Sequence, residues 1–563
     1  MKSQQFRRMI WGVGLVSAMI LLLAIGCDDN STEPSNNPPN VPINPIPINE
    51  GSVRNTDPVT LAWTCTDPES DDMTYNVYFG VTATSDRVAD SLTEASYQTD
   101  ALDYGVTYYW QVVAFDSEGD STISPVWSFV VDSTMTPQKY LLDSDIEAGD
   151  SLHITADTIW VLSGFVFVED GAMLSIEEGT VIKARPGTGI NASALIVARG
   201  GRIHANGTAD HPIIMTSEAD DTDDPTDLPL TVKGLWGGLI ILGAAPNNNA
   251  GGIGQIEGIP SDEPRGEFGG TDPHDNSGTV RYVSIRHGGS DIGAGNEING
   301  LTLGSVGDGT TIEYVEVYSN NDDGVEFFGG TVNVKHIAIA FCGDDGYDYD
   351  EGFNGQGQFW FFIQGASDGN HAGEHDGATG NEQGTPYAIP VISNATYIGS
   401  GATSVNEDNL AIIMRDNAGG KYYNSIIYGF HNDGLQVEDL TDTLSQDSRK
   451  RLEAGDIVYQ HNIWYSFGPG NTAADIWTQD FVRTYMTNTD NDNDIVDPQL
   501  EGVSRTANGG LDPRPNASGP AASGAVIPSG SFFESVSYKG AFDPAATPWI
   551  AGWTALSQYG FIQ

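Results

Sequence analysis

The chain contains few basic residues. Lys and Arg together make up 24 of its 563 residues, against 77 Asp and Glu, so its formal net charge is −53. Nucleic acids are bound by basic surfaces, and this composition therefore excludes nucleic acid as a partner. The length exceeds that of one ordinary domain, and 68 glycines among short apolar runs favour strands and tight turns over long helices.

Cysteine is also scarce, with only Cys27, Cys65 and Cys342 in the chain. We expect Cys65 and Cys342 to lie in different domains, each inside an apolar run. This placement predicts free thiols rather than a disulfide.

The amino terminus holds a long apolar run, from Met9 to Gly26, after a basic start. This order is typical of a secretory signal, although the run could also span a bilayer as a retained anchor. Its end, LLLAIGC, resembles a bacterial lipobox, which implies lipidation of Cys27. We therefore interpret residues 1–27 as a lipoprotein signal peptide and expect an exported protein, held by acyl chains at the outer membrane or cell surface.

Two segments of different composition follow the signal. Residues 28–40 are rich in Pro and Asn, which indicates an extended tether. Residues 41–133 contain short alternating runs separated by turns, as in a β-sandwich. Trp63 and the runs TYYWQVVAFD and SPVWSF resemble a fibronectin type III domain, and the resemblance implies a spacer.

The remainder of the chain is repetitive. Pieces that begin at Val280, Ile312 and Val334 read VRYVSIRHGGSD, IEYVEVYSNNDDG and VKHIAIAFCGDDG, with apolar residues at the fourth and sixth places. Period two predicts strands with one buried and one exposed face, the latter carrying Glu316 and its equivalents. Repeats near 22 residues with glycine turns favour a parallel β-helix, in which stacking of the coils makes the core.

Several runs resemble right-handed parallel β-helix proteins of the pectin-lyase-like superfold, and more closely a group of bacterial surface proteins of largely unassigned function. They are GAMLSIEEGTVIKA, ALIVARGGRIHANGTADHPIIMTS, KGLWGGLIILG and DDGVEFFGG. The resemblance implies an all-β chain, with the β-helix over residues 134–500 and a last coil and cap over 501–563. This superfold hosts lyases, hydrolases, adhesins and stalks, so function must be argued from a site.

The candidate site includes an acidic stretch, residues 344–364, that lacks Lys and Arg. Asp322 and Asp323 occupy the same places in one repeat as Asp344 and Asp345 in the next, so the pairs should lie about 4.8 Å apart. Such carboxylates repel each other unless they are protonated, solvated or bound to a cation such as Ca²⁺. The predicted calcium ligands are Asp322, Asp323, Glu326, Asp344, Asp345, Asp348, Asp350 and Glu351.

A catalytic interpretation of the same region is also open. The order of SNNDDG, CGDDG, NHAGEHDG and IIMRDN is loosely similar to that of polygalacturonase motifs. This similarity implies catalytic roles for Asp323, Asp344, Asp345, His371 or His375, and Arg415. A lyase would instead need a basic residue beside calcium, for which Arg415 and Lys421 are the nearest candidates.

The run QFWFFIQ follows the acidic stretch. If Phe359 and Phe361 face the core, Trp360 is exposed and available to stack on a sugar ring; packing in the core is the alternative. We therefore expect a non-enzymatic surface protein that binds a glycan or a surface partner, with calcium as the candidate stabilising ion. The alternatives are a polysaccharide hydrolase or lyase, and a structural stalk or surface-layer component.

Overall fold

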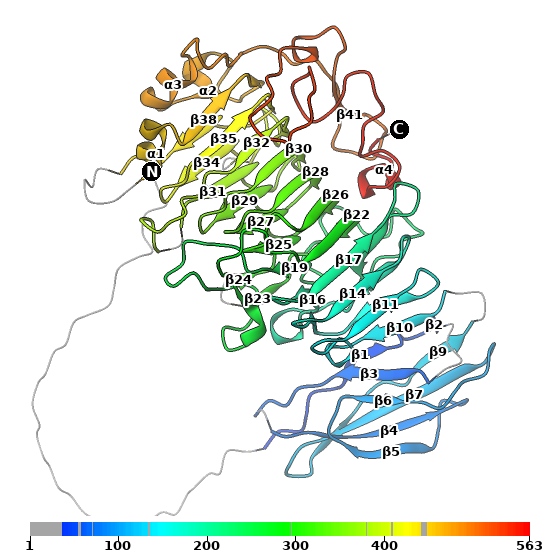
Figure 1. Ribbon diagram of the computed structural model, residues 1–563. Coiled ribbons are helices and arrows are strands. Elements are labelled where there is room, and N and C mark those ends of the chain that lie inside the picture. The colour runs from blue at the N-terminus through cyan, green and yellow to red at the C-terminus, as the bar shows by residue number, and fades with distance from the viewer. Residues whose placement is uncertain are drawn as a thin grey trace, which may run out of the picture. The chain divides into compact units, whose positions relative to one another are not determined.

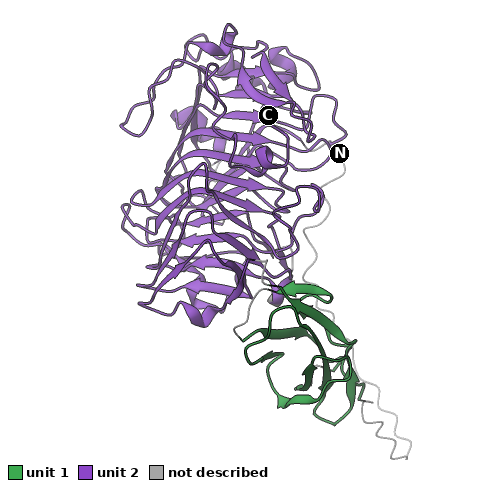
Figure 2. Cartoon of the chain, turned by 90° about the vertical axis from the view of Figure 1, so that its right-hand side faces the viewer, with its two compact units in different colours: residues 1–133 green, residues 134–563 purple. Residues whose placement is uncertain are grey.

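The computed structural model contains two compact units, residues 1–133 and 134–563 (Figures 1 and 2). Cys27, the rest of the signal and most of the tether lie outside the described residues. Within the described residues, no helix combines the length and the apolar character needed to cross a membrane. The described residues are 36–53, 58–69, 71–132, 136–293, 296–378, 380–406, 409–440 and 447–562.

The N-terminal unit has two sheets and a core of its own. Alternate residues of β7 face this core, and the rings of Trp110 and Trp127 pack there with centroids 4.6 Å apart. One sheet has the order β1 (Ile43–Ile46), β3 (Thr60–Thr64) and β6 (Ser96–Gln98). The other has the order β2 (Gly51–Val53), β9 (Trp127–Val131), β7 (Thr107–Phe115), β4 (Thr74–Gly80) and β5 (Arg87–Leu92), with β8 (Ser121–Ile123) beside β7.

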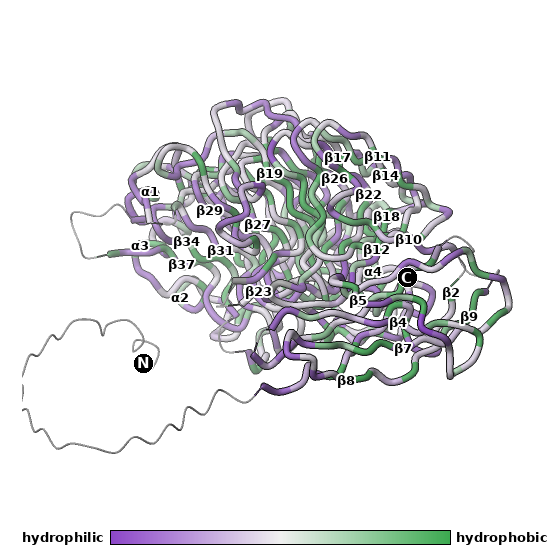
Figure 3. Tube along the Cα trace, turned by 90° about the horizontal axis from the view of Figure 1, so that it is seen from below, coloured by the Kyte–Doolittle hydropathy of each residue, from purple (hydrophilic) through white to green (hydrophobic). Residues whose placement is uncertain are grey.

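The second unit is the predicted parallel β-helix, and the all-β prediction is confirmed. Its coils build a long sheet and a short sheet around a core of aliphatic and aromatic side chains. Figure 3 shows hydrophobic segments along the strands and hydrophilic ones mainly at the rim. The short sheet comprises β13 (Phe165–Val168), β16 (Ala194–Val197), β19 (Leu239–Leu242), β25 (Leu301–Gly304), β27 (Val325–Phe328), β29 (Tyr347–Asp350), β31 (Gly373–Asp376), β34 (Ile412–Arg415) and β37 (Leu435–Val437).

The long sheet runs the length of the β-helix. Its strands are β10 (Gln138–Leu141), β11 (Ser151–Ile154), β12 (Ile159–Leu162), β14 (Met173–Ile176), β15 (Val181–Ala184), β17 (Arg202–Asn206), β18 (Ile213–Ser217), β22 (Gly278–Arg286), β26 (Thr311–Tyr318), β28 (Asn333–Ala340), β30 (Gln356–Ile363), β32 (Val391–Ser393), β33 (Thr396–Ile398), β35 (Gly420–Tyr423), β36 (Ile426–Tyr428), β38 (Ile457–Gln460) and β39 (Ile463–Tyr465).

The register predicted from the repeats is confirmed. Val280 of β22 pairs with Ile312 of β26, and Ile312 pairs with Val334 of β28. Cys342 is a free, buried thiol and Cys65 a free, half-buried one, so the absence of a disulfide between them is also confirmed.

The predicted exposed face of these strands is instead buried. Glu316 has no exposed surface, and its carboxylate accepts hydrogen bonds from the backbone N–H groups of Ala555 (2.6 Å) and Leu556 (3.1 Å). Both donors belong to α4 (Ala555–Gln558), in the C-terminal segment that lies beside β22, β26, β28 and β30 (Figure 1). The exposed-face prediction was wrong because this segment, distant in sequence, covers the sheet.

The C-terminal segment contributes apolar side chains to that cover. It contains the hairpin β40 (Leu500–Val503) and β41 (Leu511–Pro515), and its Phe542 and Phe561 pack against Phe361 and Phe341. Three further helices lie between β37 and β40 in the sequence: α1 (Ser448–Ala454), α2 (Ala473–Ile476) and α3 (Asp480–Met486).

In the aromatic run of β30, Trp360 points into the core, and Phe359 and Phe361 point outward. Trp360 is fully buried in the β-helix core, with its ring centroid 4.3 Å from that of Tyr347. Phe359 and Phe361 face outward and are covered by the C-terminal segment. Trp360 is therefore not available to stack on a sugar ring, and the alternative prediction, packing in the core, is the one that the structure shows.

Candidate metal centre

Successive strands of the short sheet bring carboxylates into a row. Glu326 of β27 pairs with Asp348 of β29, and Asp348 pairs with Glu374 of β31. Their neighbours along the strands, Val325 and Tyr347, belong to the core. Because side chains alternate along a strand, the three carboxylates project from the outer face, about 4.8 Å apart from coil to coil.

Asp-Gly turns add a second row just before these strands. The N–H of Gly324 donates to the carbonyl of Asp345 (3.0 Å), which places the turn after Asp323 directly over the turn after Asp345. A Cβ on Gly324 would lie 2.4 Å from Cγ2 of Ile339 and 2.7 Å from the carbonyl oxygen of Gly346. Glycine after each aspartate therefore permits the close approach that stacks the carboxylates.

Three of these carboxylates form a buried set that we call the inner group: Asp323, Glu326 and Asp348. Their ligand atoms lie within 4.8 Å of one another, and each residue is at most 8% exposed. One oxygen of Asp348, Oδ1, is buried and has no hydrogen-bond partner among the described residues. Asn299 donates from Nδ2 to Glu326, and its own buried Oδ1 likewise has no partner there.

A second set, the outer group, comprises Asp322, Asp323 and Asp344. Its ligand atoms also lie within 4.8 Å of one another, and it shares Asp323 with the inner group. Asp344 is exposed and Asp322 is half-buried, so this group opens to solvent. The N–H of Asp345 donates to Oδ1 of Asp323 (2.8 Å) and fixes the shared carboxylate.

The electrostatics of both groups disfavour ionised carboxylates without a cation. Burial raises the pKa of Asp323, Glu326 and Asp348 well above ordinary values, and repulsion from neighbouring carboxylates raises it further. The pKa of Asp322 is raised to about 8, chiefly by burial and further by repulsion from Glu257 and Glu297. No Lys or Arg among the described residues forms an ion pair with any member of the inner or outer group.

A third set, the paired group, comprises Asp345, His371 and Glu374. Oδ1 of Asp345 lies 2.9 Å from Nδ1 of His371, and Oε1 of Glu374 lies 2.9 Å from Nη2 of Arg415. Burial acts to lower the pKa of His371, but the hydrogen bond and the charge of Asp345 raise it overall. This part of the face therefore carries its own cations, whereas the inner and outer groups do not.

Four residues singled out from the sequence lie elsewhere. Asp350 and Glu351 belong to none of the three groups, and Oε2 of Glu351 accepts from Nδ2 of Asn249 (2.6 Å). His375 is buried in the core, where Nε2 lies 2.7 Å from the hydroxyl of Tyr422. Lys421 lies on β35 of the long sheet, whereas Arg415 lies on β34 of the short sheet.

Sequence reasoning missed four polar residues at this face. Glu374 and Asp376 could have been found by extending the repeat register one coil beyond Asp348. Asn299 could have been found because Asn299-Gly300 occupies the place that the Asp-Gly turns occupy in later coils. Glu257 could not have been found from the sequence, because it lies in a long insertion without the repeat. Its half-buried carboxyl group hydrogen-bonds with Glu326, and burial is the main cause of its raised pKa.

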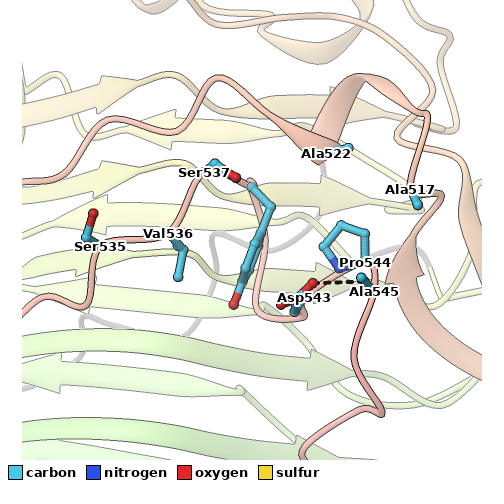
Figure 4. A pocket seen from close by; sticks show the side chains of 9 residues that line it. Ala517, Ala522, Ser535, Val536, Ser537, Asp543, Pro544 and Ala545 are labelled. Atoms are coloured by element: carbon cyan, nitrogen blue, oxygen red, sulfur yellow. Dashed lines mark hydrogen bonds between the residues drawn. The ribbon is translucent and has the colours of Figure 1, made fainter.

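A pocket of about 390 Å³ lies in the C-terminal segment, apart from the carboxylates (Figure 4). Its polar side chains are those of Ser535, Ser537, Tyr538 and Asp543, and Oδ1 of Asp543 is engaged by the N–H of Ala545 (2.8 Å). None of the candidate catalytic or metal-binding residues lines it, so the acidic face remains the main candidate site.

The comparison with protein families agrees with the β-helix fold. The family described as a pectate-lyase-like β-helix domain matches residues 146–499. Similar solved structures include pectate lyase PelI from Erwinia chrysanthemi in complex with tetragalacturonic acid, at 9% identity, covering 70% of this chain and 90% of that one, with a TM-score of 0.13. Another is pectate lyase Pel3 from Pectobacterium carotovorum, at 8% identity, covering 73% and 93%, with a TM-score of 0.14. No curated protein matches, and at these TM-scores the structural likenesses carry no argument.

Proposed function

The chain belongs to the pectate-lyase-like β-helix family, and on that premise we propose that it is a calcium-dependent, non-enzymatic protein that binds a glycan or a partner at the cell surface. The observation that carries the proposal is the inner group, in which three buried carboxylates meet and one of their oxygens, Oδ1 of Asp348, has no hydrogen-bond partner among the described residues. The fold is compatible with glycan binding and with action on polysaccharides.

Calcium suits this face better than other biological cations. Ca²⁺ takes six to eight oxygen ligands from clustered carboxylates, amide carbonyls and water, in flexible geometry. The inner and outer groups contain only carboxylate oxygens, and Oδ1 of Asn299, beside Glu326, is a carbonyl oxygen without a partner in the described part of the chain. A bound cation would offset the repulsion that otherwise raises these pKa values.

The environment of Arg415 favours binding over lyase chemistry. A lyase needs a base that can lose its proton beside the cation. Arg415 instead donates to both oxygens of Asp376 (2.8 Å each) and to Glu374, and these bonds raise its pKa further. The guanidinium therefore stays protonated and serves as a fixed positive charge on the face.

One observation favours the enzymatic alternative, a hydrolase or lyase acting on acidic polysaccharides. His371 is held by Asp345 through Nδ1, and its Nε2 makes no hydrogen bond among the described residues. An oriented imidazole is a usual form of general base or acid. We rank this function second because the other carboxylates near His371, those of Asp344 and Glu374, are not arranged around an identified substrate position.

The test is binding of the full chain to a panel of neutral and acidic glycans, with calcium and with excess chelator. The proposal expects calcium-dependent retention that is lost in Asp348→Asn. The matched control is Asp376→Asn, which removes a carboxylate on the same face that Arg415 already neutralises. Depolymerisation of an acidic polysaccharide, lost in His371→Ala, would favour the enzyme instead; no binding under any condition would favour a stalk.

Membrane anchoring through Cys27 is part of the same proposal and is tested separately. Lipidation makes two or more acyl chains available for stable anchoring. Cys27→Ser should move the chain from the membrane fraction to the soluble fraction. Retention of this variant in the membrane would instead favour an uncleaved anchor from Met9 to Gly26.

A further inference from the structure

We infer that the acidic face holds two divalent cations, one in the inner group and one in the outer group, bridged by the carboxylate of Asp323. The inference rests on the proposed calcium-dependent function and adds the number and the sharing of the ions. Its starting point is that Asp323 contributes a ligand atom to both groups, while Glu326 and Asp348 belong to one and Asp322 and Asp344 to the other.

The geometry suits a bridging carboxylate. Asp323 has two oxygens, and the N–H of Asp345 fixes Oδ1 at 2.8 Å, so the carboxylate is oriented before an ion binds. The two groups lie on adjoining coils, with Asp322 and Asp323 in one turn, Asp344 in the next turn and Asp348 on the following strand. A carboxylate between such groups can give one oxygen to each ion.

The unpartnered oxygen of Asp348 points to a ligand independently of the clustering. Asp348 is 8% exposed, and its buried Oδ1 has no hydrogen-bond donor among the described residues. A buried carboxylate oxygen without a donor or cation loses its hydration without compensation. A cation within reach of Asp323, Glu326 and Asp348 supplies that compensation.

The charge balance favours two ions over one. The inner and outer groups together contain five carboxylates, and they form no ion pair with Lys or Arg among the described residues. One divalent cation leaves three negative charges in a mostly buried cluster, and two leave one. The two sites differ in access, since every inner ligand is buried and the outer group includes exposed Asp344. The inner ion should exchange slowly, and the outer ion should keep more water ligands.

The experiment counts calcium ions bound by the full chain. The chain is stripped with chelator and dialysed against calcium in about 0.15 M KCl, which screens exposed charges. Glu326→Gln should lose one ion relative to the wild type, Asp344→Asn should lose the other, and the double variant should lose two. Asp323→Asn should lose both, and Asp376→Asn should lose none. Luminescence lifetimes of bound Tb³⁺ in water and heavy water should resolve two ions with different numbers of water ligands.

The outcomes separate this inference from the proposed function. If Glu326→Gln, Asp344→Asn and their combination all lose the same single ion, the two-ion inference is overturned and calcium-dependent function is retained. If no variant loses an ion and chelator changes nothing, both fail. Circular dichroism of each variant identifies any loss of ions caused by unfolding, and the wild-type count and Tb³⁺ lifetimes decide the question without the variants.

Discussion

The metal hypothesis predicts that the charge of Asp348 affects folding stability differently with and without calcium. The carboxylate of Asp348 lies with those of Asp323 and Glu326 and forms no ion pair with a Lys or Arg of the described residues. A buried charge without a partner destabilises a fold, whereas the same charge bound to a cation contributes to its stability. The effect of removing this charge should therefore change sign with calcium.

We predict that Asp348→Asn raises the unfolding temperature in chelator and lowers it in saturating calcium. Each difference should correspond to about 1–3 kcal/mol, the usual scale for an uncompensated buried polar group. Thermal unfolding followed by circular dichroism, with Asp376→Asn as the control, measures both. A change of the same sign in both conditions would contradict the metal hypothesis.

The pH dependence follows from the raised carboxyl pKa values. Asp322 has a pKa of about 8 and Glu374 of about 7, in both cases chiefly through burial. Between the unfolded pKa, near 4, and these values, the native chain holds protons that the unfolded chain has lost. Its stability therefore falls as pH rises through this window.

We expect the unfolding temperature in chelator to decrease from about pH 5 to pH 8, as these linked protons are lost. Saturating calcium should flatten or reverse this trend, because the cation replaces the protons. Thermal unfolding at fixed ionic strength tests both parts. A chelated chain that becomes more stable toward pH 8 would show that other groups dominate the linkage.

At the scale of the element, β30 shows how facing decides the role of an aromatic side chain. The left-handed backbone at Phe359, with φ of 60°, interrupts the regular alternation of this strand. Trp360, next along the strand, faces the core and lies between Tyr347 and Phe327, with ring centroids at 4.3 and 5.9 Å. Equivalent left-handed residues occur at Tyr282, Tyr314 and His336 in the preceding coils.

Trp360→Ala should therefore act on stability and leave ligand contacts intact. Large-to-small substitution of a buried aromatic residue lowers the free energy of unfolding by about 3–5 kcal/mol. Tyr104→Ala, at a half-exposed site of the N-terminal unit, is the control and should change it by about 0.5 kcal/mol or less. Denaturant unfolding measures the difference. A Trp360→Ala chain of unchanged stability that fails to bind glycan would restore the sugar-binding interpretation.

At the scale of the second unit, the C-terminal segment closes one side of the β-helix. It covers outward residues of the long sheet, among them Phe341, Phe359 and Phe361. The buried carboxylate of Glu316 accepts hydrogen bonds from two N–H groups of the segment's helix α4. Without this segment, the long sheet would present a contiguous apolar patch, and Glu316 would lose its two backbone hydrogen-bond donors.

Truncation after residue 499 should therefore produce a chain that binds a hydrophobic dye and self-associates. Size-exclusion chromatography and dye fluorescence measure these effects against the full chain. Calcium binding should persist in any fraction that stays folded, because the inner group lies on the short sheet. A truncated chain that remains monomeric and binds no dye would contradict the covering role.

How much the sequence predicts depends on how far apart the interacting residues lie. The 22-residue spacing between Ile312 and Val334 was sufficient to predict the β-helix, its register and the stacking of the Asp-Gly turns. Period two predicted that Val315 and Val317 face inward, and both are buried. These are local patterns that repeat, so one coil predicts the next.

Which acidic residues have partners follows from contacts made in the folded chain. Arg415 neutralises Glu374 and Asp376, 41 and 39 residues earlier, and Asn299 reaches Glu326 from the preceding coil. Glu316, 239 residues from Ala555, is buried by a segment without any repeat. The repeating strands could be predicted from the sequence alone, because their spacing is local. The fold determined the charge balance of the candidate site, because compensation depends on contacts between distant parts of the chain.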